Sequence, residues 1–85
     1  MPRRQGTRSH TSDEAERELR ALGAAIRRER DRRGWTLEAM SEATGLDPAY
    51  LARVESGRIN ITFRSLHRIG AGLGMTTSSL FAGVG

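Results

Sequence analysis

The sequence has no cysteine, no lysine, only four aromatic residues and no long apolar run. Without cysteine, neither disulfides nor thiolate metal ligands can form. His10 and His67 lie far apart in the chain with no carboxylate cluster between them, so we expect no metal and no cofactor. No stretch approaches the roughly 18 apolar residues of a membrane span, and the N-terminus lacks the apolar core of a signal peptide. We therefore expect an intracellular protein without a membrane partner.

Catalytic constellations are also missing. The sequence shows no paired carboxylates near a histidine, no activated nucleophile and no glycine-rich phosphate loop, so we expect that the protein is not an enzyme. Its 85 residues are enough for one small domain. Such a domain has to gain its stability from tight helix packing, because disulfides and metals are excluded.

All 14 basic residues are arginines, and the formal net charge is +4. The charge is uneven: residues 1–12 contain three arginines and no acid, and residues 27–33 contain five arginines and two acids. Arginine suits phosphate groups and base edges, so the pattern favours an anionic partner. The arginine-rich codon usage of a GC-rich genome is the alternative explanation.

The N-terminal stretch over residues 1–11 has almost no apolar side chain. Burial cannot offset the entropy cost of ordering it, which predicts a disordered basic tail. The folded domain is expected over residues 12–82. Thr11 and Glu14 have the spacing of a capping box at the start of its first helix.

Apolar spacing and helix-capping residues predict five helices and no strands. The first helix runs to about Arg33 and stops at Gly34, and short helices follow in the ranges 37–44, 47–56, 63–73 and 75–81. The expected caps and stops of the later helices are Thr36, Gly45, Asp47, Gly57, Thr62 and Gly74. The expected core positions include Ala15, Leu19, Leu22, Ile26, Trp35, Met40, Leu51, Val54, Phe63, Leu66, Ile69, Leu73, Leu80 and Phe81.

Residues 37–56 form the most informative pattern. Two short amphipathic helices are separated by Gly45, which supplies a left-handed backbone, and the second starts at Asp47-Pro48. Two helices joined by so short a turn are typical of a helix-turn-helix motif.

The stretch from Leu22 to Phe81 resembles the Xre/Cro-type helix-turn-helix domain of phage repressors and many bacterial regulators. The resemblance includes the order of the helices and implies a compact, all-α, lambda-repressor-like domain that binds double-stranded DNA, usually as a homodimer. The segment "GLDPAYLARVESGRINITFRSLHRI", residues 45–69, is similar to controller proteins of restriction–modification systems. Those proteins tend to carry a tyrosine at the position of Tyr50 and an asparagine at that of Asn60.

A helix fits the major groove with its N-terminal residues against base edges, and helix 47–56 is the one that the resemblance places there. The candidate base readers are Pro48, Ala49, Tyr50, Ala52 and Arg53. Arg53 can fork onto guanine, with a phosphate contact or a solvated charge as the alternatives. Tyr50 can contact DNA or pack on the domain surface.

Other residues of the protein are candidates for contacts with the phosphates of the DNA backbone. Helix N-termini attract phosphates, and the resemblance places two of them, with the loop before the fourth helix, next to the DNA backbone. The candidate residues are Thr36, Leu37, Arg58, Asn60 and Thr62. Arg32 and Arg33 precede the first motif helix and are further candidates, with a solvated face as their alternative. Leu37 stands where the family often has glutamine.

The resemblance also implies a structural ion pair between Arg30, on the apolar stripe of the first helix, and Glu55, late in the recognition helix.

Together, these features predict a sequence-specific transcriptional regulator in the bacterial cytoplasm, at the nucleoid. It would repress as a homodimer on a palindromic operator. The alternative is a protein-interaction module or antitoxin partner with weak or lost base readout. Pro48, Ala49 and Ala52 favour that alternative, because they cannot make directional hydrogen bonds.

Overall fold

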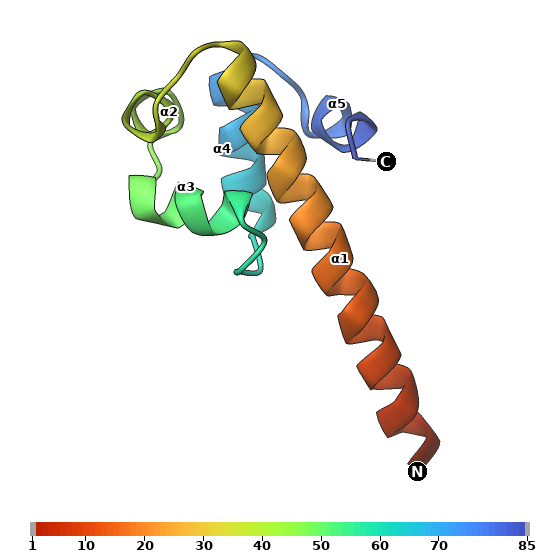
Figure 1. The fold of residues 1–85 in the computed structure, drawn as a ribbon. Coiled ribbons are helices and arrows are strands. Elements are labelled where there is room, and N and C mark those ends of the chain that lie inside the picture. The colour runs from red at the N-terminus through yellow and green to blue at the C-terminus, as the bar shows by residue number, and fades with distance from the viewer. Residues whose placement is uncertain (1, 85) are drawn as a thin grey trace.

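The computed structural model describes the backbone of residues 2–84 and the side chains of residues 13–84. Its five α-helices are α1 (Pro2–Arg32), α2 (Leu37–Thr44), α3 (Pro48–Glu55), α4 (Phe63–Leu73) and α5 (Thr77–Ala82) (Figure 1). No strand occurs in the described backbone. The predicted all-α class and the number and order of the helices are therefore confirmed.

Helix α1 begins earlier than the sequence predicts. Its helical backbone starts at Pro2 and passes through Thr11, whereas the sequence predicts a disordered tail over residues 1–11. Elongating an existing helix adds one hydrogen bond for each residue fixed, so a helix nucleated by packing can extend into unpacked sequence. The N-terminal turns project away from the other helices (Figure 1), which gives the molecule its longest dimension of 48 Å. The division into tail and domain at residue 12 stays a prediction.

Threonine hydroxyls cap three helices. Oγ1 of Thr36, Thr62 and Thr76 accepts a hydrogen bond from the backbone N–H three residues later, at 3.1, 3.1 and 3.0 Å. Asp47 occupies the N-cap position of α3, but its side chain makes no capping hydrogen bond. The start of α3 therefore depends on Pro48, whose fixed φ suits the first helical position.

The core lies where α1 to α5 converge. Its fully buried side chains are Ile26, Met40, Leu51, Ile69 and Leu80. Leu22, Val54, Leu66 and Leu73 extend it, as the helical spacing predicts, and Trp35 packs on it while half-buried.

Three expected core positions were wrong. Phe63 is 72% exposed and Phe81 50% exposed, and Ala15 lies on the surface. Phe63 lies one turn before Leu66, the first buried residue of its stripe, and Ala15 lies two turns before Leu22, the first buried residue of its own. At both positions the apolar spacing continues beyond the part of the helix that the other helices cover.

Candidate nucleic-acid interface

Helices α2 and α3 form the helix-turn-helix predicted at 37–56. Gly45 ends α2 with a φ of 75°, and its N–H donates to the Ser41 carbonyl. The hydroxyl of Thr44, a buried polar residue, donates to the Met40 carbonyl at 2.8 Å and accepts from the Leu46 N–H at 3.2 Å. These bonds fix the turn between the two helices. Thr44 could not be singled out from the sequence, since a threonine late in a helix carries no distinctive signal.

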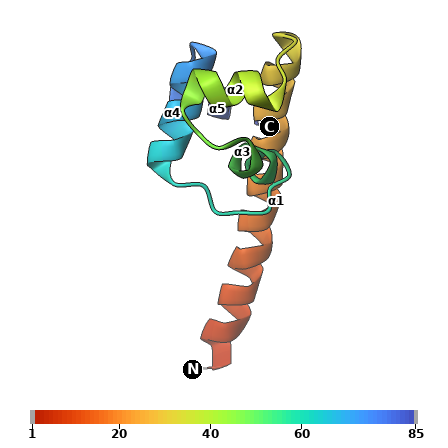
Figure 2. The same cartoon turned by 90° about the vertical axis from the view of Figure 1, so that its left-hand side faces the viewer.

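Helix α3 has one buried face and one exposed face. Leu51 and Val54 are buried in the core, and Ala49, Ala52 and Arg53 are exposed. Figure 2 shows α2 and α3 side by side on one side of the molecule, with the chain between α3 and α4 passing below them. The guanidinium of Arg53 has no partner among the side chains that the structure describes. It is thus available for an external ligand.

The five candidate base readers do not form one equivalent set. Ala49, Ala52 and Arg53 share the exposed face, whereas Pro48 and Tyr50 are half-buried. Tyr50 packs against the core cluster, which agrees with the alternative that it packs on the domain surface rather than contacting DNA. The most accessible chemistry on α3 is therefore two methyl groups and one guanidinium.

The candidate phosphate contacts lie at the beginnings of α2 and α4. Thr36 and Thr62 are exposed, but each hydroxyl already caps its helix, so the free backbone N–H groups remain to receive an anion. Arg58 and Asn60 are exposed in the segment before α4. Leu37, in contrast, is half-buried against the core. Only its backbone suits a phosphate contact.

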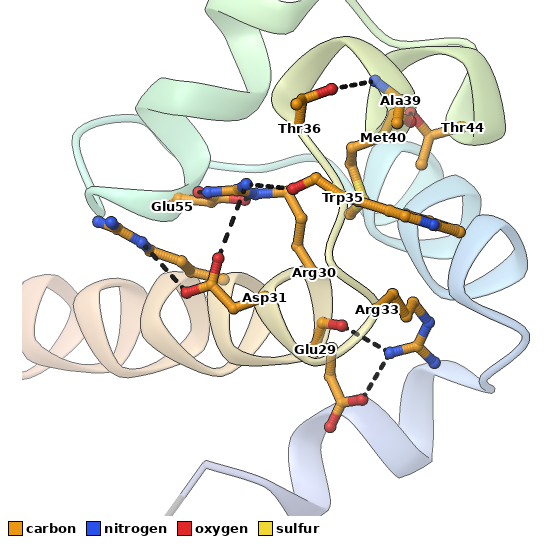
Figure 3. Close-up of polar contacts among 11 residues, drawn as sticks. Glu29, Arg30, Asp31, Arg33, Trp35, Thr36, Ala39, Met40, Thr44 and Glu55 are labelled. Atoms are coloured by element: carbon orange, nitrogen blue, oxygen red, sulfur yellow. Dashed lines mark hydrogen bonds and ion pairs between the residues drawn. The ribbon is translucent and has the colours of Figure 1, made fainter.

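Arg30 and Glu55 form the ion pair that the family resemblance implies (Figure 3). Arg30 Nε donates to Glu55 Oε2 at 2.7 Å, and Nη2 donates to Oε1 at 3.0 Å. The two side chains are 12% and 7% exposed. The hydrogen bonds that Arg30 donates to Glu55 raise the pKa of Arg30, and Arg30 Nη1 also donates to the Trp35 carbonyl at 2.7 Å. The pair joins the end of α3 to α1 and to the chain before α2.

Arg33 takes part in packing rather than in an open basic surface. Its Nη1 donates to Glu29 Oε1 at 2.9 Å and its Nη2 to the Leu73 carbonyl at 2.7 Å, near the C-terminal end of α4. The hydrogen bond that Arg33 donates to the Glu29 carboxylate (Figure 3), together with the charge and hydrogen bond of Arg32, holds the pKa of Glu29 below its usual value. Arg33 is therefore occupied within the domain, and a phosphate contact would require its release from α4.

Close backbone approaches fix α3 on α1. A Cβ atom at position 23 would lie 2.6 Å from the Glu55 carbonyl oxygen, so only glycine fits there without a shift. Gly23 could not be singled out from the sequence, because a glycine within a helical pattern does not reveal which backbone it approaches.

An open apolar groove has no α3 residue in its lining, although Asn60, a candidate phosphate contact, borders it. It has a volume of about 380 Å³ and is formed by α1, the segment before α4, α4 itself and α5. Its lining residues include Leu19, Ile61, Phe63 and Phe81, with Glu18 on the α1 side. Leu80 and Phe81 were both expected core positions, but only Leu80 is buried, whereas Phe81 borders the groove.

The fold and this geometry define a helix-turn-helix domain, and comparisons with known proteins agree. A family model described as "Helix-turn-helix domain" matches residues 21–80. The HTH-type transcriptional regulator SutR of Escherichia coli K12 is 32% identical over 63 residues, which cover 74% of this chain and 35% of SutR. The control protein C.MunI of a Mycoplasma species is 36% identical over 47 residues, covering 55% of this chain and 64% of that protein. The chain thus spans about one third to two thirds of the length of these curated relatives.

Solved structures show the same fold. The clp gene regulator ClgR of Corynebacterium glutamicum superposes with a TM-score of 0.73 at 32% identity, covering 78% of this chain and 70% of ClgR. The restriction–modification controller protein C.AhdI of Aeromonas hydrophila gives 0.72 at 27% identity, covering 74% and 96%. The chain belongs to the Xre-type helix-turn-helix family of transcriptional regulators. Within the described residues, no helix is both long and apolar enough to cross a membrane.

Proposed function

We propose that this domain is a sequence-specific regulator that binds double-stranded DNA as a homodimer and reads a palindromic operator through α3. The observation that carries the proposal is the exposed face of α3, where Ala49, Ala52 and an unpartnered Arg53 lie together. An α-helix fits the major groove, where each base pair presents a distinct pattern of donors, acceptors and methyl groups. The Arg30–Glu55 pair and the Gly23 contact hold this helix rigidly on α1.

The surroundings of α3 suit the DNA backbone. The N-termini of α2 and α4 present free backbone N–H groups and the positive ends of their dipoles. Exposed Arg58 and Asn60 lie in the segment between α3 and α4. These groups supply phosphate contacts that position α3, whereas the base contacts supply specificity.

A second copy of the chain completes the proposed reader. Helix α3 has eight residues and reaches few base pairs, whereas a two-fold pair of helices reads two half-sites. The apolar groove bordered by Phe63 and Phe81 is the surface that we assign to self-association. Acidic Glu18 lies on its α1 side, and exposed Arg64 follows Phe63 on its α4 side, so a two-fold copy can match opposite charges.

The test is selection of bound duplexes from a random pool at near-physiological salt, followed by sequencing. An enriched palindrome with half-sites about one helical turn apart, roughly 34 Å, supports a dimeric regulator. Binding without enrichment that vanishes as salt rises contradicts it. That result would favour the alternative, a protein-interaction module with weak or lost base readout, for which the exposed groove would be the docking surface.

A further inference from the structure

The exposed face of α3 offers little hydrogen-bonding chemistry. Besides Arg53, the polar residues of the helix are Tyr50 and Glu55. Glu55 is 7% exposed and is held by Arg30 through two hydrogen bonds, and Tyr50 is half-buried against the core. Neither an amide nor a hydroxyl side chain projects from this face. Direct base readout by α3 therefore has to combine one guanidinium with apolar contacts.

The two exposed alanines match one feature of the major groove. Alanine methyl groups make favourable apolar contacts with the C5-methyl group of thymine, which no other standard base carries. Ala52 and Arg53 follow Ala49 by three and four residues, so all three share one helix face. A methyl group contacted by an alanine thus lies next to the base edge that Arg53 can reach.

We infer that this domain recognises the C5-methyl group of a pyrimidine next to a guanine, with Ala49 and Ala52 contacting the methyl group and Arg53 bound to guanine O6 and N7. The inference rests on the proposed function and names the chemistry by which the domain selects its DNA sequence. Thymine carries this methyl group in unmodified DNA. A 5-methylcytosine presents the same methyl group at the same place in the major groove, so the domain also accepts a methylated cytosine at this pyrimidine position.

The experiment compares two random duplex pools, one synthesised with thymine and one with deoxyuridine, which lacks only the C5-methyl group. Both are selected in parallel on the full chain at the same salt concentration. Duplexes enriched from the thymine pool are then remade with deoxyuridine. Each thymine contacted by an alanine is expected to weaken binding about fourfold when its methyl group is removed, as estimated from the burial of one CH₂ group.

Variants connect the effect to α3. Ala52→Gly removes the protein methyl group, so the ratio of affinities for the thymine and deoxyuridine duplexes should fall towards one. Ala24→Gly, at an exposed position of α1, is the matched control for the lower helix propensity of glycine and should leave the ratio unchanged. This is a double-mutant cycle between a protein methyl and a DNA methyl, and a purely structural role of Ala52 would not change the ratio.

The outcomes separate the two proposals. Equal enrichment and affinity in both pools overturn methyl readout but leave a sequence-specific regulator. If neither pool yields an enriched sequence, both the methyl readout and the proposed sequence-specific regulator are overturned. A thymine-dependent motif whose methyl preference is the same in wild type and Ala52→Gly overturns the assignment to Ala52. Higher affinity with a 5-methylcytosine–guanine pair than with a cytosine–guanine pair at the position weakened by deoxyuridine supports methyl readout.

Discussion

Gly57 lies directly against the backbone of Arg20. A Cβ atom at position 57 would be 2.7 Å from the Arg20 Cα, and Gly57 also has a φ of 73°. Two separate constraints therefore act on this residue, one from its own backbone conformation and one from α1. Together with Gly23, it sets how closely the end of the proposed recognition helix approaches α1.

These constraints can be separated with two substitutions. Gly34 also has a positive φ, of 68°, but a Cβ there would meet nothing within 4 Å. Gly34→Ala should cost about 1–2 kcal/mol of unfolding free energy from the left-handed backbone alone. Gly57→Ala should cost distinctly more, because α1 or α3 must also shift. Urea denaturation of both variants measures the difference, and equal losses would show that the contact with Arg20 can relax freely.

The Arg30–Glu55 pair gives a second prediction about stability. Glu55→Ala leaves the guanidinium of Arg30 nearly buried without its carboxylate and should cost about 3–5 kcal/mol of unfolding free energy. Glu42→Ala, at an exposed position of α2, is the matched control and should stay within about 0.5 kcal/mol of wild type. Similar melting shifts for the two variants would refute the structural role of the pair.

Acidic pH should weaken the contact between α1 and α4. The pKa of Glu29 is lowered from 4.5, first by its hydrogen bond with Arg33, so its contribution to stability is full above pH 4.5 and is lost as the pH falls through the lowered pKa. Glu29→Gln should destabilise the protein at pH 7 by less than about 1 kcal/mol, since the pair is partly solvated. Unfolding of both proteins across pH 3–7 checks this: the difference should shrink at acidic pH, and a constant difference would contradict it.

The sequence predicts the features of this fold that depend on local chemistry. Gly45 ends α2, and Thr36 and Thr62 cap their helices, because a left-handed backbone and a capping hydroxyl need only nearby residues. The Arg30–Glu55 pair could be predicted only by resemblance, since 25 residues separate the partners.

Tertiary contacts account for what the sequence analysis missed. The exposure of Phe63 depends on where the covering helices end, and the role of Gly23 depends on which carbonyl it approaches. Arg33 has the composition of a phosphate contact, yet its partner is the Leu73 carbonyl, 40 residues away. Spacing along one helix cannot specify such a partner.

The N-terminal arginines give a prediction for DNA binding. Arg3, Arg4 and Arg8 are cations without neighbouring acids. If they contact phosphates, deletion of residues 1–10 should reduce the slope of log affinity against log salt by about 0.9 for each phosphate that they neutralise. The measurement is fluorescence anisotropy of the full and shortened chains over a salt series. An unchanged slope would mean that the arginines remain solvated when DNA is bound.

The apolar groove gives a prediction for assembly. Phe63→Asp places a charge at a position that is 72% exposed in the single chain, so folding should be nearly unaffected. If a second copy covers the groove, the substitution buries that charge against apolar surface and should weaken self-association by at least tenfold. Ala71→Asp, at another exposed position of α4, adds the same charge outside the groove-lining residues and serves as control. Sedimentation equilibrium measures both variants, and equal dissociation constants for Phe63→Asp and wild type would exclude this groove as the dimer interface.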